Sequence, residues 1–315
     1  MEILGSVEIF LTQGMLYSIL AMGYYVSYSI LDFPDLTVEG TFLTGGVMFG
    51  LFVHWGINPW FGLLAAFVAG ALCGMLTGIL HVKLNIRPLL CGILVSTALI
   101  SVNIIGVTAG LYGDLAAESS PIISFGRDAV TLSDVFFARW IPARLSALGN
   151  IPLRLPLLIL TVAMVCKLLL DAYLKTKNGL LLRATGNNAQ YVKLLGVDPG
   201  KSKIIGLALA NGFASIAGAL YTHNANGVNQ SMGLGMVVIG LASLIIGLSA
   251  FKKVRFLKPT TKVIFGAVIY QACLVAVQKF GIPSAYNKLI MAALFTAVLV
   301  LGYAGKGRGT LYADA

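Results

Sequence analysis

The sequence predicts an all-α protein, built as a polytopic transmembrane helical bundle. Of its 315 residues, 58% are hydrophobic and only 11% are charged, and the mean hydropathy is +0.89. A soluble domain carries about 25% charged residues, and a disordered chain is poor in apolar ones, so both classes are excluded. The 36 glycines suit such a bundle, because small residues let membrane helices approach closely.

Apolar runs long enough to cross a bilayer divide the chain into about nine spans. The second and the seventh are short and rich in glycine, which suggests half-helices or broken helices. The spans cover residues 8–30, 36–54, 60–82, 88–111, 153–175, 203–223, 233–250, 263–280 and 286–304. We expect residues 1–304 to form a single transmembrane domain and residues 305–315 to form a cytoplasmic tail.

The basic residues predict the orientation of these spans. Sixteen of the 22 lysines and arginines lie in the loops 83–87, 167–203 and 252–262 or in the tail. Cytoplasmic loops carry an excess of basic residues, so these segments are expected inside and, with nine spans, the N-terminus outside. The same bias explains the net charge of +10 without a nucleic-acid partner.

The segment 112–152 does not span and is expected outside. Its apolar residues recur at helical spacing, opposite Asp134, Arg139 and Arg144; they are Val135, Phe136, Trp140, Ile141, Leu145 and Leu148. This pattern predicts an amphipathic helix lying on the outer membrane interface. An alternative is a docking surface for an acidic partner, because Arg139 and Arg144 would present two guanidinium groups outside.

No pattern in the sequence indicates an enzyme. The chain has no HExxH, no GxSxG and no GxxxxGK[ST] phosphate loop, and its histidines and cysteines are scattered. We therefore predict no catalytic residue, metal or cofactor. Any ATP-driven role requires a partner chain that binds the ATP.

A first polar segment lies between the first two spans. Asp32, Asp35 and Glu39 fall within eight residues around Pro34, which is expected to end the first helix. Capping of the next helix by Asp35 or Thr37 is one interpretation. The other is a broken segment that lines a polar path, with Asp35, Thr37, Glu39 and Thr41 as its candidate residues.

A second polar segment precedes the seventh span. It contains the neutral amides Asn224, Asn226, Asn229 and Gln230. Amides are costly in hydrocarbon, so they face water, protein or a permeant. An ordinary polar loop is one interpretation, and a second part of the translocation path is the other. Each polar segment follows a long span and precedes a short one, on opposite sides of the membrane, as in an inverted repeat.

The cytoplasmic loop 176–202 is predicted to contain one short helix, bracketed by Gly186 and Gly196. Its expected cap is Asn187 or Asn188, and its apolar residues are Tyr191, Val192, Leu194 and Leu195. A helix of two turns is unstable alone and must pack on something. The alternatives are the bundle itself and the groove of a partner protein.

Four stretches of the sequence resemble a known family. Gly179–Asn188, Leu195–Val197, Gly206–Asn211 and Ser215–Leu220 are similar to the ABC-importer permeases of the branched-chain amino acid and ribose type. The stretch Leu31–Gly40 resembles the branch of that family often assigned to tryptophan or other aromatic amino acids. Because this stretch departs from the branched-chain subgroup, it argues against leucine, isoleucine or valine as the main substrate.

The resemblance implies a set of partners and roles. The short helix from about Asn188 to Leu195 would be the coupling helix, seated in a cleft of an ATPase subunit. The permease would form a homodimer in the bacterial inner membrane and receive a small polar solute, an amino acid, from an extracytoplasmic binding protein. Arg139 and Arg144 would help to dock that protein. The rival hypothesis is an ion-coupled secondary carrier that uses Asp32, Asp35 or Glu39 and needs no docking helix.

Overall fold

The computed structural model is an all-α bundle, as predicted, and describes residues 2–112, 123–124, 132, 154–254, 256–279 and 286–304. Its α-helices are α1 (Glu2–Tyr24), α2 (Thr37–His54), α3 (Pro59–Leu84), α4 (Pro88–Tyr112), α6 (Arg154–Tyr173), α7 (Lys177–Asn187), α8 (Ala189–Leu194), α9 (Pro199–Ala225), α10 (Met236–Ala250), α11 (Pro259–Lys279) and α12 (Asn287–Ala304). The short elements are the π-helix η1 (Tyr25–Ile30), the 3-10 helix η3 (Gln230–Gly233) and the strands β1 (Ile123–Ser124) and β2 (Gly227–Val228).

A helix occupies each of the predicted spans. Seven segments of the described chain are long and apolar enough to cross a membrane, and α2 and α12 occupy the two remaining ranges. The second and seventh spans have shorter helices than most others, since α2 has 18 residues and α10 has 15. At 1.5 Å per residue, α10 alone is shorter than a hydrocarbon core of about 30 Å, and it reaches spanning length only together with η3.

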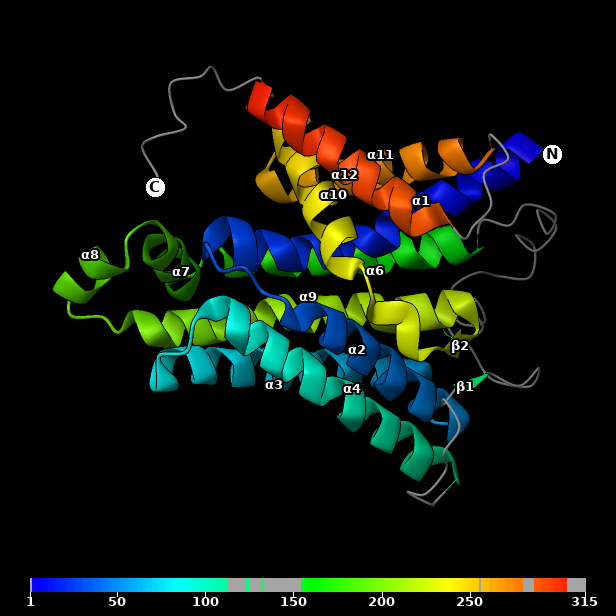
Figure 1. Ribbon diagram of the computed structural model, residues 1–315, viewed down its shortest axis with the longest axis horizontal. Coiled ribbons are helices and arrows are strands. Elements are labelled where there is room, and N and C mark those ends of the chain that lie inside the picture. Colours follow the sequence, from blue (N-terminus) through cyan, green and yellow to red (C-terminus); the bar gives the residue numbers. More distant parts are fainter. Residues whose placement is uncertain are drawn as a thin grey trace.

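The predicted cytoplasmic loops gather toward one end of the bundle. The α3–α4 turn, the α10–α11 connection and the end of α12 lie toward the left of Figure 1, with α7 and α8 at its edge. The start of α1 and the strands β1 and β2 lie at the opposite end. This arrangement places the loops that carry most of the basic residues on one side, as the positive-inside rule requires.

Small residues let the central helix α9 pack closely against its neighbours. On α3, Gly70, Gly74 and Gly78 recur every four residues and face α9. A Cβ atom at Gly74 would collide with the carbonyl oxygen of Leu207 on α9. This spacing of small residues is typical of membrane helices in close contact, where packing replaces the hydrophobic effect as the driving force.

Two helices begin inside the bundle instead of at its ends. The first long helix becomes the π-helix η1 and ends at Ile30, and residues 31–36 form no regular helix before α2 starts. Similarly, α10 starts after η3, at Gly235, whose φ of +89° is a left-handed conformation that suits glycine. In Figure 1, α2 and α10 both start near the middle of the bundle and run toward opposite ends.

The strands β1 and β2 pair antiparallel at the end of the bundle opposite α7 and α8. Ile123 of β1 and Val228 of β2 are both buried, and both lie against Gly50 of α2. The strand pair is thereby attached to the end of α2. The predicted amphipathic helix, with Arg139 and Arg144, lies outside the described residues.

Candidate functional site

Asp35 lies in a buried network of hydrogen bonds between α2 and α9. Its Oδ1 accepts the backbone N–H of Thr37, the first residue of α2, at 2.9 Å, although Leu36 and not Asp35 occupies the N-cap position. Its Oδ2 accepts a 2.6 Å hydrogen bond from Nδ2 of Asn211, a residue of α9 that is fully buried. Thr41 Oγ1 donates to Asn211 Oδ1 at 2.9 Å. One asparagine therefore holds both the start and the second turn of α2.

Thr37 extends this network to α3. Its Oγ1 lies 2.9 Å from Oγ1 of Thr77, and both residues are fully buried. Three candidate path residues, Asp35, Thr37 and Thr41, thus lie in contacts between helices in this conformation of the protein.

Glu39, the fourth candidate of this segment, has a different environment. It is half-buried in the first turn of α2, and its Oε1 accepts the N–H of Gly235 at 3.0 Å. Gly235 is the residue that precedes α10, so the carboxylate lies at the N-terminus of that helix. A helix N-terminus carries a partial positive charge and unpaired N–H groups; the Glu39 carboxylate is favourable to that charge and accepts one of those N–H groups, that of Gly235.

The four amides of the second polar segment occupy separate positions. Asn224 is half-buried near the end of α9, and Asn226 is the exposed residue after it, in a left-handed conformation with φ of +51°. Asn229 caps η3, because its Oδ1 accepts the N–H of Ser231 at 3.0 Å. Gln230 lines a pocket.

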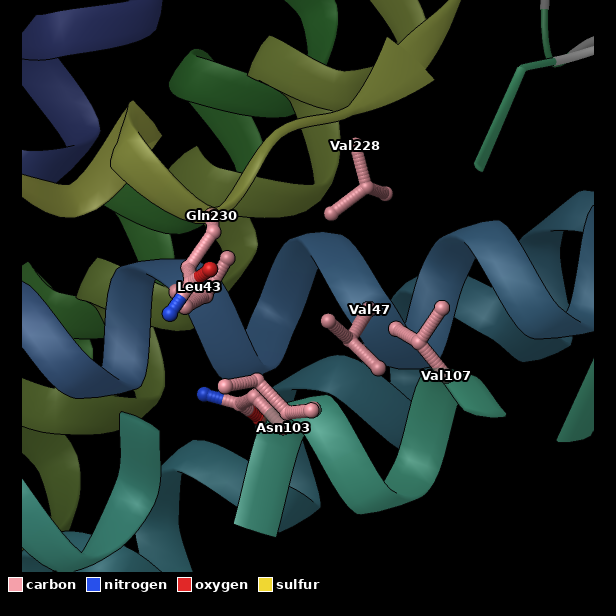
Figure 2. A pocket seen from close by; sticks show the side chains of 7 residues that line it. Leu43, Val47, Asn103, Val107, Val228 and Gln230 are labelled. Atoms are coloured by element: carbon pink, nitrogen blue, oxygen red, sulfur yellow. The ribbon is translucent and has the colours of Figure 1, made fainter. Parts of the chain in front are cut away.

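That pocket lies between α2, α4 and the segment that joins β2 to η3 (Figure 2). Its empty volume, including the open mouth, is about 190 Å³. Five of its seven lining residues are apolar and two carry amides; they are Leu43, Val47, Ile104, Val107, Val228, Asn103 and Gln230. The lining is mostly apolar, but the pocket is smaller than the roughly 300–1,000 Å³ of typical small-molecule sites, so in this conformation it does not hold a solute.

The loop 176–202, which is expected to be cytoplasmic, contains two helices instead of the single helix expected. The second, α8, corresponds to the predicted one: Asn188 caps it by accepting the N–H of Tyr191 at 3.0 Å, and Gly196 ends the turn with a φ of +75°. The first, α7, begins at the cap Thr176 and includes both Gly186 and Asn187. Gly186 is therefore not a bracket of the short helix but lies inside α7.

The two faces of α8 differ in exposure. Val192 is fully buried, whereas Tyr191, Leu194 and Leu195 are 57%, 85% and 59% exposed. Both alternatives for the short helix thus hold in part: it packs on the protein through Val192 and leaves three large apolar side chains uncovered. These side chains lie at the end of the bundle that carries the basic loops, outside its long apolar helices. The exposed apolar surface of α8 therefore suits contact with a water-soluble partner protein.

Contacts connect α7 with the first polar segment. A Cβ atom at Gly186 would collide with the carbonyl oxygen of Ile30, the last residue of η1. Next to this contact, Leu182 of α7 and Leu31 both lie against Gly206 of α9. Leu31 is followed within four residues by Asp35, so α7 touches the segment that starts α2.

Sequence reasoning missed Asn211, Thr77 and Asn103. Each is a single polar residue inside an apolar run, which resembles ordinary helix packing in the sequence. Their partners are distant along the chain, as in the bond from Asn211 to Asp35, 176 residues away. Their position inside an apolar span could have identified them, because polar residues at membrane depth generally have hydrogen-bond partners. The described residues contain no group of three or more His, Cys, Asp or Glu side chains that could hold a metal ion.

Comparison with known proteins identifies the family. Residues 6–299 match the family described as the permease component of branched-chain amino acid transport systems. The chain is 35% identical over 292 residues to the tyrosine transport system permease protein of Clostridioides difficile. The aligned region covers 93% of this chain and 90% of that protein.

Two further relatives are more distant. An uncharacterized protein of Rickettsia prowazekii is 29% identical over 285 residues, covering 89% of this chain and 92% of that protein. The probable branched-chain amino acid transport permease protein LivH of Methanocaldococcus jannaschii is 26% identical over 255 residues, covering 76% of this chain and 74% of that protein. No solved structure matches the chain. This multi-pass protein of the bacterial inner membrane belongs to the family of branched-chain amino acid transport permeases.

Proposed function

We propose that the chain is the transmembrane subunit of an ATP-driven amino acid importer, and that its solute is aromatic. The substrate class is supported by the relative that transports tyrosine, and by the departure of Leu31–Gly40 from the branched-chain pattern. The exposed apolar face of α8 is the observation that supports coupling to ATP hydrolysis. An ion-coupled carrier does not require such a surface, whereas an ATPase subunit needs one to bind.

Coupling proceeds through packed helices. ATP-driven closure of two ATPase subunits moves α8 and, with it, α7 of each permease in a homodimer. The contacts of α7 with Ile30 and of Leu182 with Gly206 transmit that movement to residues 31–36 and to α2. The polar segments Asp35–Thr41 and Asn224–Gln230 then open or close the path. An extracytoplasmic binding protein delivers the solute, docked in part on Arg139 and Arg144.

The test is uptake of L-tyrosine into vesicles that contain the permease, its ATPase and its binding protein. We expect uptake to require ATP and to be lost when Leu194→Asp and Leu195→Asp are combined, because two carboxylates cannot enter an apolar groove. Leu84→Asp is the control, since Leu84 is 62% exposed at the same end of the bundle, on α3. ATP-driven uptake that survives the double substitution would remove α8 from the mechanism.

A further inference from the structure

The first long helix changes its hydrogen-bonding pattern before it ends. Its last six residues, Tyr25–Ile30, form the π-helix η1, and the N–H of Leu31 bonds to the carbonyl of Val26, five residues back, at 3.1 Å. A π-turn therefore contains one residue more than an α-turn. The extra residue persists to the end of the helix, where the N–H of Phe33 bonds to the carbonyl of Ser27, six residues back, at 2.9 Å. The equivalent bond at the Schellman end of an α-helix spans five residues.

Asp32 ends this helix in a left-handed conformation. Its φ is +52°, a conformation that glycine adopts freely, that aspartate and asparagine tolerate, and that β-branched residues strongly disfavour. Such a residue marks the position at which a helix stops. If η1 rewound as an α-helix, the stop would shift by one residue and Asp32 would leave the left-handed conformation.

Other helices hold both ends of η1. Just before it, Gly23 packs so closely on α9 that a Cβ atom would collide with the carbonyl oxygen of Ala210. At its end, the carbonyl oxygen of Ile30 lies against Gly186 of α7. The change from α-turns to π-turns thus lies between a contact with the central helix and a contact with α7.

The residues after η1 contact α9, α3 and α2. Leu31 packs on Gly206 of α9, and the ring of Phe33 lies edge-on to that of His81 on α3, with 5.2 Å between the ring centroids. Asp35 accepts the first N–H of α2. A shift of one residue along an α-helix is a rise of 1.5 Å and a rotation of about 100°. Rewinding η1 would therefore withdraw Leu31 and Phe33 from their contacts and pull on the start of α2.

We propose that η1 is a hinge, which changes between the π-helix of this conformation and an α-helix and thereby moves the start of α2. The inference rests on the proposed function and specifies where movement of α7 becomes movement of α2. A displacement of α7 acts on the carbonyl group of Ile30, while Gly23 keeps its place on α9. Residues 31–36, which form no regular helix, take up the shift. π-Turns within α-helices are rare and frequently lie at functional sites.

The first experiment deletes Ser29, an exposed residue of η1. Loss of one residue converts the π-turn into an α-turn while α1 and Leu31 keep their places. Because the hinge then has a single conformation, we expect ATP-driven uptake of L-tyrosine to fall at least tenfold, while the permease–ATPase complex still hydrolyses ATP. Ser29→Ala is the matched control, since it changes the same side chain and keeps the length, and it should transport like the wild type. Equal uptake by the deletion and by Ser29→Ala would overturn the hinge.

The second experiment compares Asp32→Val with Asp32→Gly. Both substitutions remove the carboxylate, so their difference reports only the backbone: valine disfavours the left-handed conformation and glycine favours it. The two conformations are counted by ¹⁹F NMR of a trifluoromethyl label on Ser29→Cys, in the complex in nanodiscs after replacement of the four native cysteines. We expect two resonances whose ratio changes with ATP, and a ratio that differs about tenfold between the valine and glycine variants.

The control for backbone strain is the same pair of substitutions at Asn85. This residue follows α3 and is also left-handed, with a φ of +53°, but it lies outside the hinge. Asn85→Val and Asn85→Gly should therefore give equal ratios of the two resonances. Equal ratios in the two Asp32 variants would overturn the hinge.

The outcomes separate the hinge from the proposed function. A wild-type complex without ATP-driven uptake of L-tyrosine would overturn the proposed function. A wild-type complex that transports L-tyrosine but shows a single resonance, which neither ATP nor the Asp32 substitutions change, would overturn the hinge alone. If the deletion of Ser29 does not assemble, the two Asp32 variants carry the test.

Discussion

Asn211 illustrates how much one residue contributes to this bundle. Its side chain makes three hydrogen bonds with other residues: to Asp35 Oδ2, to the carbonyl of Leu207 and from Thr41. We expect Asn211→Ala to destabilise the solubilised protein by about 2–3 kcal/mol or more, because the Asp35 carboxylate would stay buried with fewer partners. Thermal unfolding in detergent measures the effect as a lower melting temperature.

The control for this prediction is Asn178→Ala. Asn178 is exposed in the first turn of α7, so its truncation is expected to change stability by no more than about 0.5 kcal/mol. Equal melting temperatures for the two variants would show that the buried network contributes nothing to the stability of the folded state.

For single residues, the sequence predicts local hydrogen bonds such as helix caps but not the partners that are distant along the chain. The bonds at Asp35 and Asn188 are readable because acceptor and amide lie two or three residues apart. The pair of Thr37 and Thr77 spans 40 residues and depends on how α2 and α3 pack. Nothing in either local sequence specifies that packing, so single-sequence reasoning could not find the pair.

The helices of the loop 176–202 also show what can and cannot be predicted from local sequence. The helix α8 was predictable from its cap, its apolar residues and Gly196. The helix α7 was not, because its sequence KNGLLLRATGN contains two glycines and lacks a clear apolar face, so its propensity is weak. Packing stabilises it instead, with Leu182 fully buried and Gly186 in contact with η1. Tertiary contacts thus override a poor local signal.

The amphipathic helix predicted in 112–152 leads to a prediction at the same scale. If Arg139 and Arg144 contact an acidic face of the binding protein, then Arg139→Glu combined with Arg144→Glu replaces attraction by repulsion. We expect the affinity of the complex for its binding protein to fall about tenfold or more, and basal ATPase activity to stay unchanged. Titration of the binding protein on the immobilised complex checks this.

Arg154 provides the control for that substitution. It is also expected on the outer side, but it starts α6 and does not belong to the amphipathic segment. Arg154→Glu should therefore leave docking near the wild-type level. An unchanged affinity in the double charge reversal would assign Arg139 and Arg144 to membrane anchoring alone.

For the whole molecule, composition was sufficient to predict the fold class, and charge gave an orientation that stays a prediction, whereas the contact between the two broken segments required coordinates. A chain with 58% hydrophobic and 11% charged residues has few other folds available to it. That α2 and α10 start beside each other, joined by Glu39 and Gly235, follows from contacts over 196 residues. The sequence predicted each of the two polar segments separately, but it did not predict that they lie next to each other.

The proposed coupling to ATP requires that α8 faces the cytoplasm and binds a nucleotide-hydrolysing subunit. The most direct measurement places a single cysteine at Leu194, after replacement of the four native cysteines, and labels it with a membrane-impermeant maleimide. We predict labelling only from the inner side, and protection when the ATPase subunit is bound. Labelling from the outer side, or labelling that the ATPase does not reduce, would contradict the account.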